Sequence, residues 1–290
     1  MAYKFPLLVS LLAILASTQY AGVRVQAPPQ YGRAAAEAAD REEGVVAANT
    51  GRNRRAKAPP KTKFEEDVIQ TLGGDLKITS VGHASVMFTF GGKVIHVDPV
   101  SDIADYSLLP KADLILVTHE DPDHLDRKAV KTLSGDKTAL IVCPNCSLYL
   151  PMGRIMINGE TDSVAGFKVE AVPAYNIFGR GGNGKPYTPR GSANGYILTF
   201  GDKRVYVAGV TESIPEMLKF RPIDVAFLPL NEIGRGLALR TMNLSMFSDA
   251  VAALQPKILF PYNYGSNDPK GFAGLVKNQQ GVDLRVRDMK

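Results

Sequence analysis

The side chains best suited to chemistry lie close together in residues 118–126. His119 and His124, two of the four histidines in the chain, are five residues apart, with three carboxylates between them. Histidine and aspartate at the end of a buried strand are a common way to build a metal or catalytic site. A simpler alternative is a strand followed by a helix whose N-cap is Asp121 or Asp123, although a cap needs one aspartate and no histidine.

The surrounding sequence predicts elements that would hold this segment in place. An apolar run over 113–119 predicts the central strand, and the spacing over 125–133 predicts a helix. Strands come first along the chain and later alternate with helices, which predicts an α/β fold built as a four-layer αββα sandwich. The other predicted strands are 76–80, 86–90, 93–97, 138–142, 154–157, 166–172, 196–200, 204–208, 223–230, 257–260 and 282–286, with helices at 245–254 and 272–277.

The two other histidines differ in their surroundings. His83 follows a glycine at a predicted strand end, where an imidazole could reach a pocket, so both a structural and a site role are open. His96 lies inside an alternating strand and is predicted to be a hydrogen-bonded histidine of the sheet. The glycine- and proline-rich segment 177–194 has no strand before it and no helix after it, which excludes a nucleotide-phosphate loop and favours a mobile rim or lid of the site.

Residues 1–63 are predicted to be a leader. Residues 1–21 have a positive start, about twelve apolar residues and then small residues, which is typical of a secretory signal peptide and shorter than the roughly 20 residues of a stable transmembrane anchor. Residues 22–63 lack apolar periodicity and are predicted to be a disordered pro-segment or linker, with 52–55 either a dibasic processing site or a solvated charge run. The folded domain is predicted at 64–290, in a protein that enters the secretory pathway and becomes extracellular.

Charge and cysteine content narrow the function classes. Residues 1–60 hold eight basic and four acidic residues, so most of the net charge of +5 belongs to the leader. The domain therefore shows no basic surface for nucleic acid. The two cysteines, Cys143 and Cys146, form a single C-x-x-C pair, which excludes a zinc ribbon and leaves a short-loop disulfide or two free buried thiols.

The motifs of the domain resemble those of the metallo-β-lactamase superfamily. The segment from Thr118 to His124 resembles its motif T-H-x-H-x-D-H, with Asp121 in place of the second histidine. The pieces G-H-A-S at 82–85, D-P at 98–99 and P-A-Y-N at 173–176 resemble the branch of L-ascorbate-6-phosphate lactonase and N-acyl-phosphatidylethanolamine phospholipase D. The resemblance covers residues 75–288 and implies the αββα sandwich. It also implies two metal ions, usually zinc, that activate a hydroxide against an ester, lactone, amide or phosphodiester.

The chain departs from that family at most of the later metal positions. Thr188 and Val207 stand where relatives carry histidines, Val210 replaces the bridging aspartate, and Asn263 replaces the last metal histidine. Valine offers no lone pair, and a neutral amide oxygen is a poor zinc ligand. Two protein ligands remain for each ion, whereas a catalytic zinc normally has three. The replacements spare the scaffold, which indicates a fold kept for something other than two-metal hydrolysis.

These departures leave two alternatives for the cofactor. In one, a divalent ion (zinc, manganese or magnesium) is shared by His119, Asp121, Asp123 and His124, an oxygen-rich set that favours manganese or magnesium over zinc. In the other, no metal is bound. Asp121 and Asp123 are the predicted catalytic carboxylates. His83, Asn176 and Asn263 are the predicted substrate-binding residues.

Two functional hypotheses follow from the sequence. In the first, a secreted homologue of hydrolases with a degraded dimetal site uses its cleft to bind a small molecule or a lipid. In the second, an active hydrolase with a remodelled single-metal or metal-free site acts on a lactone, an ester or a phosphodiester. A purely structural extracellular protein is a third hypothesis, and it leaves the polar cluster at 119–124 without a role.

Overall fold

The computed structural model describes residues 59–230, 240–265, 274 and 281–289. Within them no helix is long and apolar enough to cross a membrane. The strands are β1 (Glu65–Thr71), β2 (Gly74–Gly82), β3 (Ser85–Phe90), β4 (Lys93–Val97), β5 (Leu114–Val117), β6 (Ala139–Val142), β7 (Arg154–Ile155), β8 (Thr161–Val164), β9 (Phe167–Ala174), β10 (Ala193–Phe200), β11 (Lys203–Val207), β12 (Val225–Pro229), β13 (Ile258–Tyr262) and β14 (Asp283–Leu284). The helices are α2 (Arg127–Leu133) and α3 (Leu244–Leu254), with short 3-10 turns η1 (Tyr106–Leu108), η2 (Asn145–Leu148) and η3 (Pro215–Lys219).

The described strands form two seven-stranded sheets with the same plan. In both sheets neighbouring strands follow one another in the chain, from β1 to β7 in the first and from β8 to β14 in the second. In each sheet the first four strands in the chain pair antiparallel and the later ones pair parallel, with the change at β4–β5 and at β11–β12. Parallel strands end at one edge, so each sheet directs several strand-to-loop connections to the same edge.

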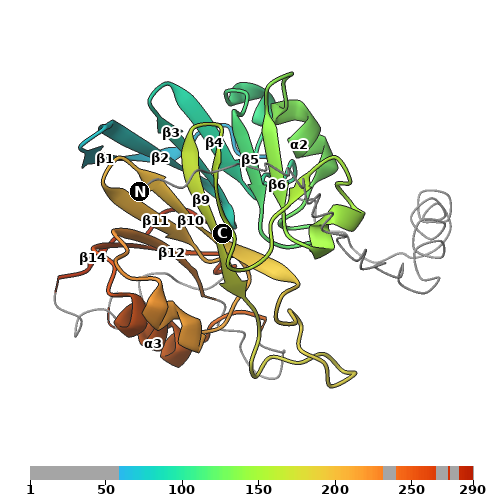
Figure 1. The fold of residues 1–290 in the computed structure, drawn as a ribbon, viewed down its shortest axis with the longest axis vertical. Coiled ribbons are helices and arrows are strands. Elements are labelled where there is room, and N and C mark those ends of the chain that lie inside the picture. Colours follow the sequence, from blue (N-terminus) through green and yellow to red (C-terminus); the bar gives the residue numbers. More distant parts are fainter. Residues whose placement is uncertain (1–58, 231–239, 266–273, 275–280, 290) are drawn as a thin grey trace, which may run out of the picture. The chain divides into compact units, whose positions relative to one another are not determined.

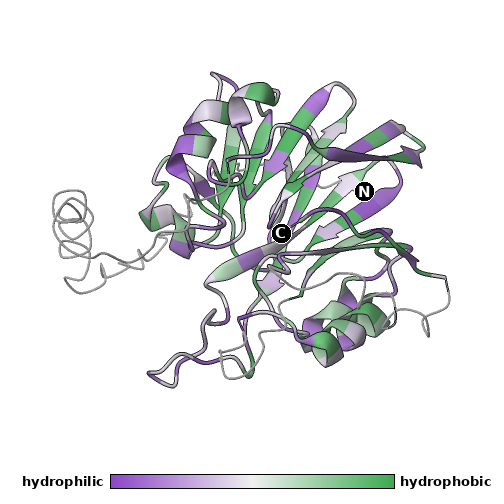
Figure 2. Ribbon diagram, turned by 180° about the vertical axis from the view of Figure 1, so that it is seen from behind, coloured by the Kyte–Doolittle hydropathy of each residue, from purple (hydrophilic) through white to green (hydrophobic). Residues whose placement is uncertain are grey.

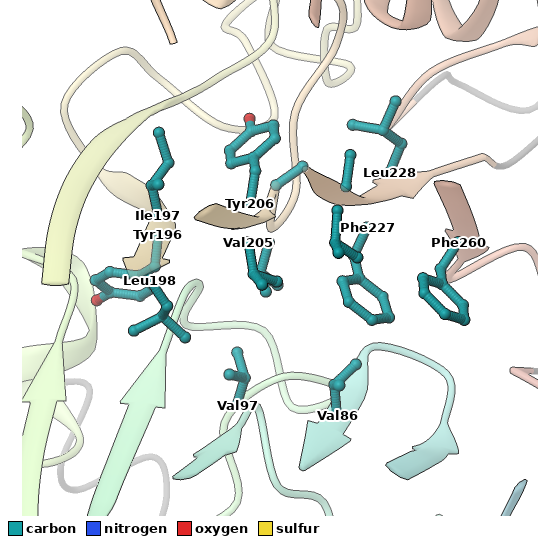
Figure 3. Close-up of a cluster of buried hydrophobic side chains, with 14 of the residues drawn as sticks. Val86, Val97, Tyr196, Ile197, Leu198, Val205, Tyr206, Phe227, Leu228 and Phe260 are labelled. Atoms are coloured by element: carbon teal, nitrogen blue, oxygen red, sulfur yellow. The ribbon is translucent and has the colours of Figure 1, made fainter. Parts of the chain in front are cut away.

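The two sheets pack face to face around the main core. In the close-up, Val86 and Val97 of the first sheet point toward Val205 and Phe227 of the second (Figure 3). Phe227 also stacks on Phe260, with ring centroids 4.7 Å apart. Truncation of such a buried ring to alanine typically costs about 3–5 kcal/mol of stability.

Helices cover the outer faces, which completes the predicted αββα sandwich (Figure 1). Strand β5 shows the alternation behind the layers, because Leu114 and Leu116 enter the inter-sheet core while Ile115 and Val117 join a second cluster beneath α2. Helix α3 buries one side, and its ribbon carries both hydrophobic and hydrophilic residues (Figure 2). The four-layer fold class is therefore confirmed.

The cap of α2 differs from the alternative considered for the motif. Asp126 is the N-cap, and its carboxylate accepts hydrogen bonds from the backbone N–H groups of Lys128 and Ala129. Asp121 and Asp123 precede the cap and do not serve as caps. Helix capping therefore does not explain why Asp121 and Asp123 are present in the motif.

Several other predictions have an outcome in the fold. Cys143 and Cys146 form a disulfide, the first of the two alternatives. His96 lies in β4 with Nε2 3.1 Å from the carbonyl oxygen of Pro110, as expected of a sheet histidine. Lys61 pairs with Ala104 in an isolated bridge, so the domain's contacts begin slightly before the predicted boundary at 64. The predicted signal peptide and nearly all of the predicted pro-segment lie outside the described residues, as does most of the helix predicted at 272–277.

Candidate metal centre

The candidate site lies where loops from both sheets meet. His83 sits in the turn between β2 and β3, Asp98 follows β4, residues 119–124 follow β5, and Asn263 follows β13. The backbone N–H of Asn263 donates to the carbonyl oxygen of His83 at 2.9 Å, which ties the two sheets together at this edge. The site therefore combines segments 180 residues apart in the chain.

The backbone is unusual at three of these residues. His83, Asp98 and Asn263 have φ values of 50°, 46° and 52°, in the left-handed region. Asn, Asp and His tolerate this region better than other non-glycine residues, and such conformations tend to cluster at functional sites. Their presence on three separate loops of one site indicates a geometry that the surrounding structure enforces.

A buried carboxylate orients His124. Asp98 is fully buried and accepts hydrogen bonds from the backbone N–H and the hydroxyl of Thr118. Its Oδ2 also lies 2.7 Å from Nδ1 of His124. Burial lowers the pKa of His124, but the charge and hydrogen bond of Asp98 outweigh burial, so its pKa lies above the ordinary value. The network assigns the proton to Nδ1, which leaves the Nε2 lone pair directed away from Asp98.

His124, His83 and Asp123 form a compact cluster of ligand atoms. One ligand atom from each of the three lies within 4.8 Å of the others. Nε2 of His83 is 3.1 Å from Oδ2 of Asp123. Burial raises the pKa of Asp123, but the hydrogen bond from His83 and the charges of His124 and His83 outweigh it, so that pKa lies well below the usual range. The cluster thus offers one carboxylate and two imidazoles to an ion.

His119 has the opposite arrangement to His124. The backbone N–H of Asp121 donates to its Nδ1 at 3.2 Å, so the neutral ring carries its proton on Nε2. Nε2 lies 3.4 Å from the hydroxyl of Thr188 and 3.5 Å from the carboxylate of Glu120. Burial is the main cause that lowers the pKa of His119, which keeps the ring neutral at pH 7. In this conformation His119 has no free lone pair for an ion.

Asp121 is paired with a cation of the protein itself. Its Oδ2 lies 2.8 Å from Nη1 of Arg240 and 3.6 Å from Nδ1 of His119. The guanidinium of Arg240 also lies over the ring of Tyr187, 4.9 Å from the centroid. Arg240 therefore supplies positive charge to the carboxylate that stands in the second-histidine position of the motif.

The segment after β9 is held by buried polar groups. The amide of Asn176 donates to the carbonyl oxygen of Arg240 at 2.9 Å and accepts from the backbone N–H of Thr188 at 2.9 Å. The buried carboxylate of Glu212 accepts from Asn176 and from three successive backbone N–H groups of residues 177–179. Asn176 and Glu212 thus fix the segment that carries Thr188 and Tyr187 toward the site.

These contacts allow a test of which residues fit a metal ion. His83, Asp123 and His124 fit, because a tetrahedral ion takes three protein ligands and one open position, and Asp98 supplies the outer carboxylate typical of a histidine ligand. The position formed by His119 and Asp121 does not fit, since Nδ1 of His119 already accepts a backbone hydrogen bond and Asp121 is paired with Arg240. Val210, at the bridging position, is buried and has no donor atom. The residues present suit one ion rather than two.

Comparison with known proteins identifies the family. The profile of the β-lactamase superfamily domain matches residues 77–263. The chain belongs to this superfamily. It is 31% identical over 225 residues to a UPF0173 metal-dependent hydrolase of Pyrococcus horikoshii, covering 71% of this chain and 95% of that protein. A similar protein of Pelotomaculum thermopropionicum is 26% identical over 228 residues, covering 73% of this chain and 96% of the relative.

A solved structure is more similar in sequence. An inferred metal-dependent hydrolase of Parabacteroides distasonis is 43% identical, with a TM-score of 0.72, and covers 79% of this chain and all of that one. The superfamily expected from the sequence motifs is therefore confirmed. The lactonase-like branch within it remains a prediction.

The site residues predicted from the superfamily sequence motifs are distributed over two neighbouring positions. Asp123 and His124 join His83, which was predicted only to bind substrate, while His119 and Asp121 lie on the Arg240 side. Asn263 places its amide nitrogen 3.3 Å from Nε2 of His124. The residues with no predicted role in the site were Asp98, Glu120, Glu212 and Arg240. Asp98 had a signal, since Asp-Pro directly follows the strand that precedes the motif, but nothing in the sequence links Arg240 to Asp121.

Proposed function

We propose that this β-lactamase superfamily member is a metal-dependent hydrolase that works with one divalent ion held by His83, Asp123 and His124. The observation that carries the proposal is the approach of these three ligand atoms to within 4.8 Å of one another. The similar proteins named as metal-dependent hydrolases, matched over nearly their whole length, support the reaction class. The substrate class is an ester, a lactone or a phosphodiester.

The residues around the cluster have separate tasks. A divalent ion in such a site polarises an acyl or phosphoryl oxygen as a Lewis acid. Asp98 holds the His124 ring in the tautomer that exposes Nε2, and Asp123 supplies negative charge to the ion. Asn263 sits beside the same nitrogen, so its amide must turn aside or present its oxygen when that position fills. His119, neutral and protonated on Nε2, is placed as a hydrogen-bond donor next to the cluster.

The first hypothesis from the sequence is kept as a second candidate. In it, the cleft binds a small molecule or a lipid without turnover. The Arg240–Asp121 ion pair favours it, because a fixed guanidinium stands beside the position where the superfamily holds its first ion. Both candidates lack two-metal hydrolysis, and they differ in whether the remaining ligand cluster supports turnover. We also propose secretion through the leader, for which the apolar run at residues 5–16 is the support.

Metal titration of the purified full chain tests the proposal. Zinc, manganese and magnesium are titrated by calorimetry into the metal-free protein, the Asp123→Asn variant and Asp136→Asn, a control at an exposed turn carboxylate. We expect one equivalent of metal for the wild type and the control, and a loss of more than about 100-fold in affinity for Asp123→Asn. Binding of two equivalents, or equal affinity in all three proteins, would contradict a single ion at this cluster.

A hydrolysis screen of the loaded protein then separates the two candidates. Para-nitrophenyl esters, lactones and bis(para-nitrophenyl) phosphate are offered to the wild type and to Asp123→Asn. Turnover that requires both the ion and Asp123 supports the hydrolase. Stoichiometric metal binding without turnover of any of these classes favours the binding protein.

A further inference from the structure

Arg240 occupies an unusual position for a surface arginine. Its side chain is 56% exposed, yet it is held at three points. Nη1 bonds Asp121 at 2.8 Å, the guanidinium lies over the Tyr187 ring, and the backbone carbonyl accepts from Asn176 at 2.9 Å. An exposed ion pair alone contributes little to stability, because holding a long side chain in one conformation costs entropy. The three contacts therefore indicate that the fixed orientation of the Arg240 guanidinium has a role in ligand binding.

The guanidinium of Arg240 has N–H donors that no described residue accepts. Arginine has five N–H groups, and among the described residues the structure gives one hydrogen bond from the Arg240 side chain, to Asp121. Two other arginines belong to the nearby segment. Arg180 donates to backbone carbonyl oxygens of its own loop. Arg190 is held as Arg240 is, by one carboxylate and one ring, but its partners Glu216 and Tyr175 are not residues of the candidate metal centre. Within the described part of the chain, Arg240 thus presents donors without a partner beside the candidate metal centre.

Asp121 links this guanidinium to the site. The same Oδ2 contacts Arg240 and His119, and the His119 ring centroid is 5.9 Å from that of His124. The neighbouring carboxylate, Glu120, has one oxygen bonded to the amide of Asn145 at 2.8 Å and the other directed at His119. Acidic groups therefore line the inner side, and an anion would be accepted on the outer, Arg240 side.

We propose that Arg240 is a specificity residue that binds an anionic group, a carboxylate or a phosphate, of the substrate while the scissile bond lies at the His83–Asp123–His124 cluster. Planar guanidinium donors match both groups in a two-bond arrangement. The inference rests on the proposed function and narrows its substrate class to esters, lactones or phosphodiesters that carry a second, negatively charged group. Arg240 takes over charge recognition at the position of His119 and Asp121, which does not fit an ion.

A matched pair of substrates tests the inference. Para-nitrophenyl hemisuccinate carries a free carboxylate, and para-nitrophenyl acetate does not. We expect the wild type to prefer the hemisuccinate, and Arg240→Gln to lower kcat/KM for it about tenfold while the acetate changes less than about twofold. Arg240→Lys keeps the charge and loses the planar pair of donors, so it should recover part of the preference. Arg180→Gln, in the same rim, is the control and should match the wild type.

Binding of anions to the metal-free full chain separates this test from hydrolysis. Succinate and inorganic phosphate are titrated by calorimetry into the wild type, Arg240→Gln and Arg180→Gln, with EDTA present so that no ion can bind the anion. The anion that binds more tightly shows whether Arg240 recognises a carboxylate or a phosphate. Its affinity should fall about tenfold in Arg240→Gln and stay unchanged in Arg180→Gln.

The outcomes separate the two proposals. If no ester is hydrolysed but Arg240→Gln loses anion binding, the hydrolase fails and the anion site stands. Equal losses for hemisuccinate and acetate would mean that Arg240 only positions Asp121 and His119, and would overturn the inference. Unchanged anion binding in Arg240→Gln would overturn it as well.

Discussion

His119 and His124 belong to one short motif and have opposite hydrogen-bonding states. Nδ1 of His124 donates to the buried carboxylate of Asp98, so Nε2 is left with a lone pair. Nδ1 of His119 accepts from the backbone N–H of Asp121, so Nε2 carries the proton. What bonds the far nitrogen decides whether a histidine is a ligand or a donor. The presence of both histidines in the motif therefore does not make both of them ligands.

The carboxylates of the motif differ in the same way. Asp123 faces the imidazole of His83, which can release its proton to solvent when a metal ion binds in its place. Asp121 faces the guanidinium of Arg240, which cannot be deprotonated in a protein. One position thus remains able to bind a cation from solution, and the other is satisfied by a cation of the chain. The absence of a carboxylate at Val210, the predicted bridging position, is consistent with that division.

Exchanging each histidine for alanine is the most direct way to break this comparison. His124→Ala should lower the affinity for zinc by more than about 100-fold, because it removes a ligand with its outer carboxylate in place. His119→Ala should change the affinity less than about threefold, since it removes a hydrogen-bond donor. Calorimetric titration measures both, and urea unfolding confirms that each variant is folded. Similar losses in both variants would show that both rings are ligands.

Removal of the outer carboxylate should have a smaller effect. Asp98→Asn keeps the side-chain shape and tolerates the left-handed backbone. If the new amide nitrogen faces His124, Nδ1 of His124 must accept its hydrogen bond, so the proton of the ring moves to Nε2. We expect zinc affinity to fall about 10–100-fold. Asp113→Asn is a matched control, because that carboxylate accepts the backbone N–H of Val94 at 2.8 Å and does not touch the site. It should lower stability and leave zinc affinity unchanged.

Restoring a ligand should act in the opposite direction. Asn263→His puts an imidazole where the superfamily motif has one, and histidine tolerates the φ of 52° at this residue. Zinc affinity should rise on the order of tenfold, because a fourth ligand is added and the amide beside Nε2 of His124 is removed. Asn263→Ala is the control, and it should show the effect of removing the amide alone. An equal rise in both variants would mean that the new imidazole is not a ligand.

The sequence was sufficient for the scaffold. Strands β3, β4 and β5 are short, mainly apolar runs, and such runs predict buried strands from local sequence alone. It was less informative where an element lacks that pattern. Strand β1 carries five polar residues and pairs with β2 over its full length, and β8 is almost wholly polar, so neither was predicted. Such edge strands are specified by the neighbour they pair with.

The site was predictable only in part for a related reason. Local spacing placed His119, Asp123 and His124 at the end of one strand, and the structure confirms that placement. Which of them point at one another depends on partners far away in the chain. Nε2 of His83 reaches Asp123 across 40 residues, and Arg240 reaches Asp121 across 119. No local pattern encodes these pairs, because each depends on how the two sheets bring their loops together.

His96 provides a reference for pH effects that do not come from the site. Burial is the main cause that lowers its pKa to about 4, against an ordinary value of 6.5. Because its pKa is depressed in the folded state, its contribution to stability is complete above about pH 6.5 and is lost as the pH falls toward 4. Between pH 7 and pH 5 that loss is about 2 kcal/mol. Urea unfolding at the two pH values should show a shallower pH dependence in His96→Gln, which keeps a donor for the Pro110 carbonyl, and an unchanged slope would place the titration elsewhere.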